Sequence, residues 1–127
     1  MRFTDSIAVD PGSRTSRAAL FVDPAADYLA DHFPGAPTLP GLVMLEAAVR
    51  AAAALWDAAE PAGSRTATLA HVDRLQVVRR VVPGEMFLVE TTDEAGDGDG
   101  DERTRSFSAR GTVSGETAMR ARFRLRR

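Results

Sequence analysis

Residues 32–60 read HFPGAPTLPGLVMLEAAVRAAAALWDAAE and contain the strongest structural signals of this chain. Three prolines near its beginning exclude regular secondary structure there, so we predict a stiff loop at residues 32–41. From about Pro40 to Glu60 apolar residues occupy nearly every face, which predicts one long helix that is buried on all sides. The Pro-Ala-Gly sequence at residues 61–63 ends this helix.

Strands are predicted on both sides of the helix. Before it, residues 3–9 and 15–22 form two strands around a Pro-Gly turn, and Asp23-Pro24 begins a short helical turn. After it, patterns separated by turn residues predict strands at residues 66–72, 75–82, 85–92, 103–113 and 117–125. One central helix with five or six antiparallel strands indicates an α+β fold in which the sheet wraps around the helix.

The composition is that of one globular domain, which we expect to span residues 1–127. Hydrophobic residues make up 44% and charged residues 27% of the chain, which excludes wholesale disorder. The absence of cysteine excludes a disulfide scaffold and a thiolate nucleophile, and two histidines are too few for a histidine-rich metal centre. No apolar run reaches the ~18–20 residues of a membrane span, so we expect a cytoplasmic protein without a membrane partner.

Charge is distributed unevenly along the chain. All sixteen basic residues are arginines, and residues 103–127 carry eight of them with one acid. In the last predicted strand, apolar residues alternate with the arginines at positions 120, 122, 124 and 126. This region could attract an acidic partner, whereas the net charge of −2 and the lone interleaved aromatic argue against nucleic acid.

Two side chains could carry acid–base chemistry. His32 begins the stiff loop, and Glu46 stands inside the otherwise apolar helix, where a carboxylate is costly to desolvate unless it is paired. A neutral histidine and a protonated carboxylic acid are the pair that a β-elimination uses. Gly41 lies at the predicted helix N-terminus, where free amides can bind an oxyanion. A loop histidine and a surface pair between Glu46 and Arg50 remain the structural alternative.

Residues 32–47, HFPGAPTLPGLVMLEA, resemble the HFPGxPxxPGxxxxEA signature of the FabZ-type 3-hydroxyacyl-acyl-carrier-protein dehydratases. A second stretch, VVPGE at residues 81–85, is similar to the PVxPGD sequence of the same family. Together with the later strands, the resemblance covers roughly residues 15–125. It implies the hotdog fold, in which an antiparallel sheet curls around a central helix.

The resemblance also implies a reaction and its residues. His32 corresponds to the histidine that removes the C2 proton of a 3-hydroxyacyl thioester, and Glu46 to the acid that protonates the departing C3 hydroxyl. Gly41 corresponds to the glycine whose amide binds the thioester carbonyl. The product is the trans-2-enoyl thioester, and no metal or organic cofactor takes part. In this family the histidine and the carboxylate come from different subunits of a dimer.

The resemblance extends to the surroundings of the site. Phe33, Leu39 and Pro40 would bind substrate. Phe33, Leu39 and Met44 would flank an acyl tunnel, with core packing as the alternative explanation for each of these three. The implied partner is an acyl carrier protein in fatty-acid or polyketide-type biosynthesis. The arginines that could contact it are Arg79, Arg122 and Arg124, for which solvated strand positions are the alternative.

Three departures from the family pattern indicate a divergent member. Arg50 replaces the glutamine that usually orients the carboxylate, so it either turns away from Glu46 or tunes it. Arg80 replaces a proline, and the segment that precedes the first motif in housekeeping members is missing. We therefore expect a homodimer or an assembly of dimers, with a heterodimer possible. The alternatives are a non-catalytic subunit of a heterodimeric dehydratase, a hotdog thioesterase or an enoyl isomerase.

Overall fold

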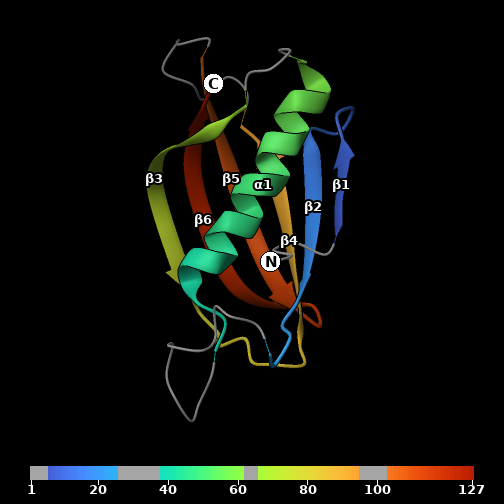
Figure 1. Ribbon diagram of the computed structural model, residues 1–127. Coiled ribbons are helices and arrows are strands. Elements are labelled where there is room, and N and C mark those ends of the chain that lie inside the picture. The colour runs from blue at the N-terminus through green and yellow to red at the C-terminus, as the bar shows by residue number, and fades with distance from the viewer. Residues whose placement is uncertain (1–5, 26–37, 62–65, 95–102) are drawn as a thin grey trace.

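The computed structural model describes residues 6–25, 38–61, 66–94 and 103–127. These residues form one helix, α1 (Gly41–Ala59), and a single six-stranded antiparallel sheet. The strands are β1 (Ser6–Asp10), β2 (Thr15–Phe21), β3 (Thr68–Val77), β4 (Met86–Asp93), β5 (Thr104–Val113) and β6 (Glu116–Arg126). Their order across the sheet is β1-β2-β4-β5-β6-β3, and the sheet curves around α1 (Figure 1). The predicted hotdog fold is confirmed.

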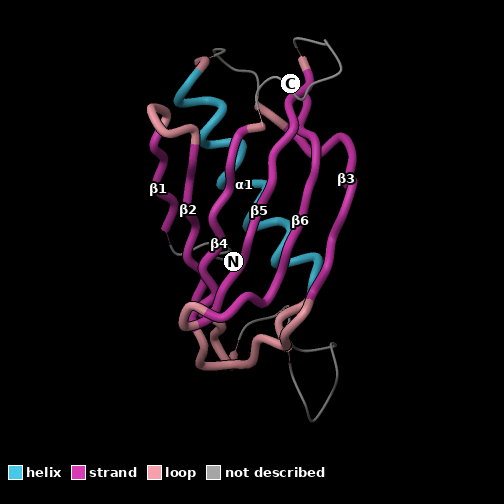
Figure 2. Tube along the Cα trace, turned by 180° about the vertical axis from the view of Figure 1, so that it is seen from behind, coloured by secondary structure: helices cyan, strands magenta, loops and turns pink. Residues whose placement is uncertain are grey.

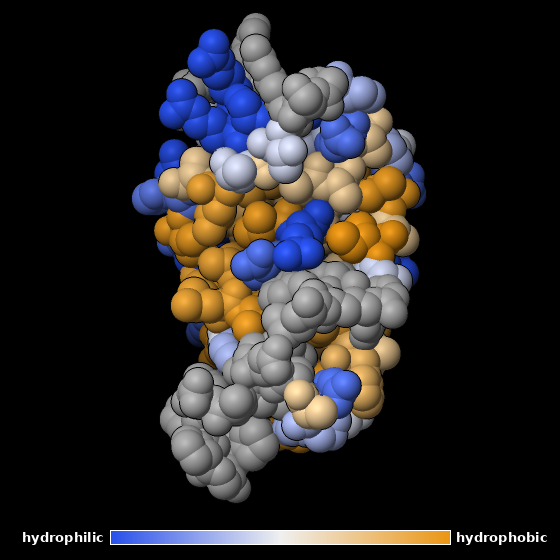
Figure 3. Space-filling model, in the orientation of Figure 1, coloured by the Kyte–Doolittle hydropathy of each residue, from blue (hydrophilic) through white to orange (hydrophobic). Residues whose placement is uncertain are grey.

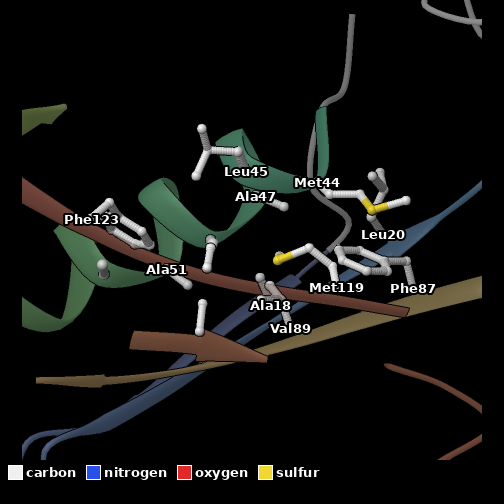
Figure 4. Close-up of a cluster of buried hydrophobic side chains, with 14 of the residues drawn as sticks. Ala18, Leu20, Met44, Leu45, Ala47, Ala51, Phe87, Val89, Met119 and Phe123 are labelled. Carbon is white, nitrogen blue, oxygen red and sulfur yellow. The ribbon is translucent and has the colours of Figure 1, made fainter. Parts of the chain in front are cut away.

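Small side chains on α1 allow the helix to lie close against the sheet. The helix residues that face the sheet include fully buried alanines, namely Ala47, Ala48, Ala51 and Ala52. The sheet supplies larger side chains, among them Phe87, Phe123 and Met119, which pack around the helix in Figure 4. The Ser16 hydroxyl on β2 donates a hydrogen bond of 2.8 Å to the Ala51 carbonyl and ties the strand to the helix.

The other face of the sheet carries no helix among the described residues (Figure 2). The predicted alternation in β6 is confirmed, because its apolar residues from Met119 to Leu125 are buried while its arginines point to the outer face. None of the described helices is long and apolar enough to span a membrane.

One strand prediction is wrong. The two strands predicted at residues 66–72 and 75–82 are a single strand, β3, which pairs with β6. Two register shifts, at residues 69–71 and 72–74, interrupt the alternation without ending the strand, which is why the sequence pattern looked divided. Beyond Val77, the amides of Val78 and Arg79 both bond to the Ala118 carbonyl, and residues 78–85 form a loop.

The helix is not buried on all sides, contrary to the prediction. Its face away from the sheet exposes Leu42, of which 74% is accessible, together with Glu46 and Arg50. Figure 3 views this side and shows mostly hydrophobic surface around a small hydrophilic area. The helix is apolar on two faces, and the described residues cover only one of them. We call this uncovered side of α1 the open face.

The turn predicted after β2 begins as expected. The Asp23 carboxylate accepts a hydrogen bond of 2.9 Å from the Ala25 amide, which is the bond an N-terminal cap makes. The continuation of this segment lies outside the described residues, and so do His32 and Phe33.

Candidate active site

The site is built around the first turn of α1. Pro40 precedes the helix, and its carbonyl accepts hydrogen bonds from the amides of Val43 and Met44. The amides of Gly41 and Leu42 therefore have no acceptor within the helix. Together with the positive end of the helix dipole, these two amides can stabilise a developing negative charge.

The glycine at this helix start lies close to the end of β3. A Cβ atom built on Gly41 would lie 3.1 Å from the Cγ2 atom of Val77, at the end of β3. A side chain at position 41 would crowd both this strand and any group that approaches the amide. Gly41 thus places no side chain between the helix N-terminus and the end of β3.

Glu46 and Arg50 lie one turn apart on the open face. The Arg50 Nε atom is 3.5 Å from the Glu46 Oε1 atom, so the predicted i,i+4 pair forms and Arg50 does not turn away. The Glu46 side chain is 55% exposed and that of Arg50 is 49% exposed. An exposed pair of this kind contributes only about 0.3–0.5 kcal/mol to stability, so the fold does not require it.

A hollow of about 720 Å³ lies beside these two residues. Its wall is mainly apolar and comes from α1 and from the beginnings of β1 and β3. The lining residues are Ile7, Leu42, Leu45, Glu46, Val49, Arg50, Ala53, Thr66, Ala67, Thr68 and Leu69. An apolar hollow with one carboxylate and one guanidinium on its wall suits an acyl chain with a polar reactive end.

The other predicted substrate-binding residues are less accessible. Leu39 is 3% exposed and packs in the hydrophobic core, while Pro40 is half-buried at the helix start. Met44, which the sequence also suggested for the tunnel wall, is fully buried and lies near Leu20 and Phe87 in Figure 4. Packing in the hydrophobic core therefore explains why residues 39 and 44 are apolar. A role of Leu39 in an acyl tunnel stays a prediction.

The predicted carrier-contact arginines are not gathered beside Glu46. Arg122 and Arg124 lie on the outer face of β6, on the opposite side of the sheet from α1. Arg124 forms an ion pair of 2.7 Å with Asp73, and its hydrogen bond lowers the pKa of that carboxyl below its usual value. Arg79 lies instead in the loop after β3, between two carboxylates.

Arg79 binds both Glu85 and Glu116. Its Nη1 and Nη2 atoms donate to the two Glu85 oxygens over 3.0 and 2.8 Å, and its Nε atom is 2.6 Å from Glu116 Oε1. The hydrogen bonds from Arg79 hold the pKa of Glu85 below its usual value. Sequence reasoning missed this arrangement because residues 75–82 were assigned to a strand, which hid the turn that brings Arg79 and Glu85 together.

Residues 9–116 match the family model described as the ApeI-like dehydratases. This chain belongs to the ApeI-like dehydratase family. It is 34% identical over 76 residues to the 3-hydroxyacyl-[acyl-carrier-protein] dehydratase FabZ of Francisella philomiragia, covering 51% of this chain and 47% of that protein. It is 38% identical over 64 residues to the FabZ of Syntrophomonas wolfei, covering 50% and 44%. The matches thus span about half the length of these curated relatives.

Solved structures share the fold of this ApeI-like chain. The dehydratase heterocomplex ApeI:P from Xenorhabdus doucetiae superposes with a TM-score of 0.68 at 19% identity, covering 98% of this chain and 96% of that one. The PaaI protein of Escherichia coli, from the phenylacetic acid degradation operon, gives 0.68 at 14% identity, covering 91% and 73%. The protein is therefore a divergent, FabZ-type member of the hotdog dehydratases, as its two motifs predicted.

Proposed function

We propose that this ApeI-like protein dehydrates a 3-hydroxyacyl thioester, carried on an acyl carrier protein, to the trans-2-enoyl thioester. The observation that carries the proposal is the position of Glu46. It lies on the wall of an apolar hollow, about 7.5 Å of helix rise from Gly41, whose amide has no acceptor within the helix. One helix thus carries both a candidate acid and a candidate oxyanion donor, which its geometry places about 140° apart around the helix axis.

The proposed chemistry divides between three residues. The Gly41 amide binds the thioester carbonyl, which makes the C2 proton acidic. His32 removes that proton as C2 and C3 form a double bond, and Glu46 protonates the C3 hydroxyl, which leaves as water. The role of His32 rests on its place in the HFPG motif, because the residue lies outside the described part of the chain.

The proposal includes a dimer. The open face exposes Leu42 and the Glu46–Arg50 pair, and β3 forms an edge of the sheet with most of its residues exposed. A second hotdog domain over this face would cover the apolar surface and bring its own HFPG loop to Glu46. We propose a homodimer of single-domain subunits, or an assembly of such dimers.

The test is dehydration of 3-hydroxyacyl chains loaded on an acyl carrier protein, followed by intact mass. The wild-type protein should remove one water, and His32→Ala and Glu46→Gln should each abolish the loss. Asp57→Asn is the matched control, because Asp57 is another exposed acid of α1 that does not line the hollow. Absence of turnover by a folded wild-type dimer, across several chain lengths, would overturn the proposal.

A second candidate function is that of a partner-dependent subunit. It is favoured by Arg50, which replaces the usual glutamine and contacts Glu46, and by the ApeI:P heterocomplex, which joins two kinds of subunit in a related fold. In that case the chain alone is inactive and a second hotdog subunit restores dehydration. A thioesterase, the alternative that the sequence leaves open, would instead release a free acid, and mass distinguishes the two products.

A further inference from the structure

The loop of residues 78–85, which we call the bracing loop, holds the segment that carries His32 at both of its ends. At the first end, the Val22 amide donates to the Glu85 carbonyl over 3.0 Å, and the Gly84 amide donates to the Val22 carbonyl over 2.8 Å. At the second end, the Leu39 amide donates to the Val81 carbonyl over 2.7 Å. One short loop therefore fixes the points where the segment between Val22 and Leu39 leaves and rejoins the described fold.

These anchor points are firm because their side chains are buried. Val22 and Val81 are fully buried and Leu39 is 3% exposed, so the bond between Leu39 and Val81 joins two buried residues, while the two bonds of Val22 reach the more exposed Gly84 and Glu85. The bracing loop also touches the start of α1, since Leu39 leads directly into Pro40 and Gly41. Figures 1 and 2 show the loop, the end of β2 and the start of the helix together at one end of the sheet.

Arg79 holds the bracing loop in shape. Its two terminal nitrogens donate to Glu85, and its Nε atom contacts Glu116 at the start of β6. The Glu85 Oε1 atom also accepts a hydrogen bond of 2.9 Å from the Val82 amide. The loop is thus tied across its own turn and to the β5–β6 hairpin. A bidentate guanidinium between two carboxylates fixes geometry in a way that a single point charge does not.

We propose that Arg79 is a positioning residue for the dehydration site: by bracing residues 78–85, it fixes Val22 and Leu39, which flank the sequence that contains His32, and with Leu39 the start of the helix that carries Gly41. This inference rests on the proposed function, because it assigns Arg79 to the same site. It also revises the suggestion that Arg79 contacts a carrier protein. Four of its contacts are already made within the chain, to Glu85, Glu116 and the Arg80 carbonyl, and a guanidinium has five donors.

The first test measures whether Arg79 stabilises the hydrogen bonds of the bracing loop, and it does not depend on enzymatic activity. Hydrogen exchange is measured for the amides of Val22, Leu39 and Gly84 in the wild type, in Arg79→Gln and in Arg17→Gln. Arg17 forms an exposed 3.1 Å pair with Glu90 on the outer face, so its variant controls for loss of a surface arginine. Arg79→Gln should speed exchange at these three amides by about tenfold or more, with the core of α1 unchanged. Arg17→Gln should leave them unchanged.

The second test measures kcat and KM for dehydration. Arg79→Gln should lower kcat by about tenfold to a hundredfold with little change in KM, because displaced reacting groups slow the chemical step. The kcat of Arg79→Lys should lie between those of the wild type and Arg79→Gln, since lysine keeps the positive charge but cannot donate two parallel hydrogen bonds to one carboxylate. Glu116→Gln removes one arm of the brace and serves as the second variant if Arg79→Gln does not fold.

The outcomes separate this inference from the proposed function. Wild-type kcat and unchanged exchange in folded Arg79→Gln would overturn the brace while the dehydratase proposal stands. A rise in KM alone, with kcat and exchange unchanged, would also overturn it and favour a docking role. If the wild type has no dehydratase activity, the proposed function fails, and hydrogen exchange still decides whether Arg79 braces the loop.

Discussion

Two glycines illustrate, at the scale of single residues, how packing and chemistry can be told apart. Gly111 on β5 faces the ring of Phe87, and a Cβ atom there would collide with two ring carbons of this fully buried side chain. Gly111→Ala should therefore lower the free energy of unfolding by about 1–3 kcal/mol, as overpacking does. Urea denaturation measures this, with Gly12→Ala as the control, because its added Cβ makes only an ordinary 3.4 Å contact. Equal stability of the two variants would contradict the packing of β5 against Phe87.

A substitution at Gly41, unlike one at Gly111, should affect activity more than stability. The Val77 methyl that an added Cβ would meet belongs to a side chain that is 45% exposed, so it can shift by a few tenths of an ångström. Gly41→Ala should change the free energy of unfolding by less than about 1 kcal/mol, since the helix also gains propensity. It should nevertheless lower kcat/KM about tenfold, because the methyl crowds the approach of the thioester to the amide. Full activity in a stable Gly41→Ala protein would contradict the close approach of the thioester to this amide that we expect.

At the scale of elements, the ion pair between Arg79 and Glu85 predicts how the bracing loop responds to acid. Arg79 holds the pKa of Glu85 below its usual value of 4.5. A lowered carboxyl pKa gives stability that is present above the usual value and is lost as the pH falls through the folded-state value. At pH 6–7 the wild type should therefore have a higher free energy of unfolding than Arg79→Gln. This difference should shrink below about pH 4.5, where Glu85 becomes protonated. Chemical denaturation across this range measures it, and a difference that grows on acidification would contradict the assignment.

The elements also show what sequence could and could not predict. Helix α1 was predicted at residues 40–60 and spans Gly41–Ala59, because proline and apolar patterning are local signals. The face of each β6 residue followed from its strict alternation. The division of β3 was wrong because bulges break alternation without breaking hydrogen-bonded pairing. The Glu46–Arg50 pair was predictable from spacing, whereas the contacts of Arg79 depend on a turn that only the fold reveals.

At the scale of the whole molecule, the open face predicts the assembly. Leu42 is 74% exposed on this face, whereas Leu88, 47% exposed, pairs with Ala19 and Thr112 on the outer side of the sheet. Leu42→Asp should convert a dimer to monomers and abolish dehydration, because a buried unpaired charge is costly. Leu88→Asp should leave the dimer and the activity intact. Size-exclusion chromatography with light scattering distinguishes them, and a dimeric Leu42→Asp protein would place the interface elsewhere.

We propose that His32 of one subunit and Glu46 of another complete each dehydration site. The most direct test of this proposal mixes His32→Ala with Glu46→Gln after dissociation, lets subunits reassociate, and measures loss of water from a carrier-bound 3-hydroxyacyl chain. Each mixed dimer would contain one site with both wild-type residues, so random pairing should restore about a quarter of the wild-type activity. A reassociated mixture that stays as inactive as either variant alone, beside an active wild type, would contradict a site shared between subunits.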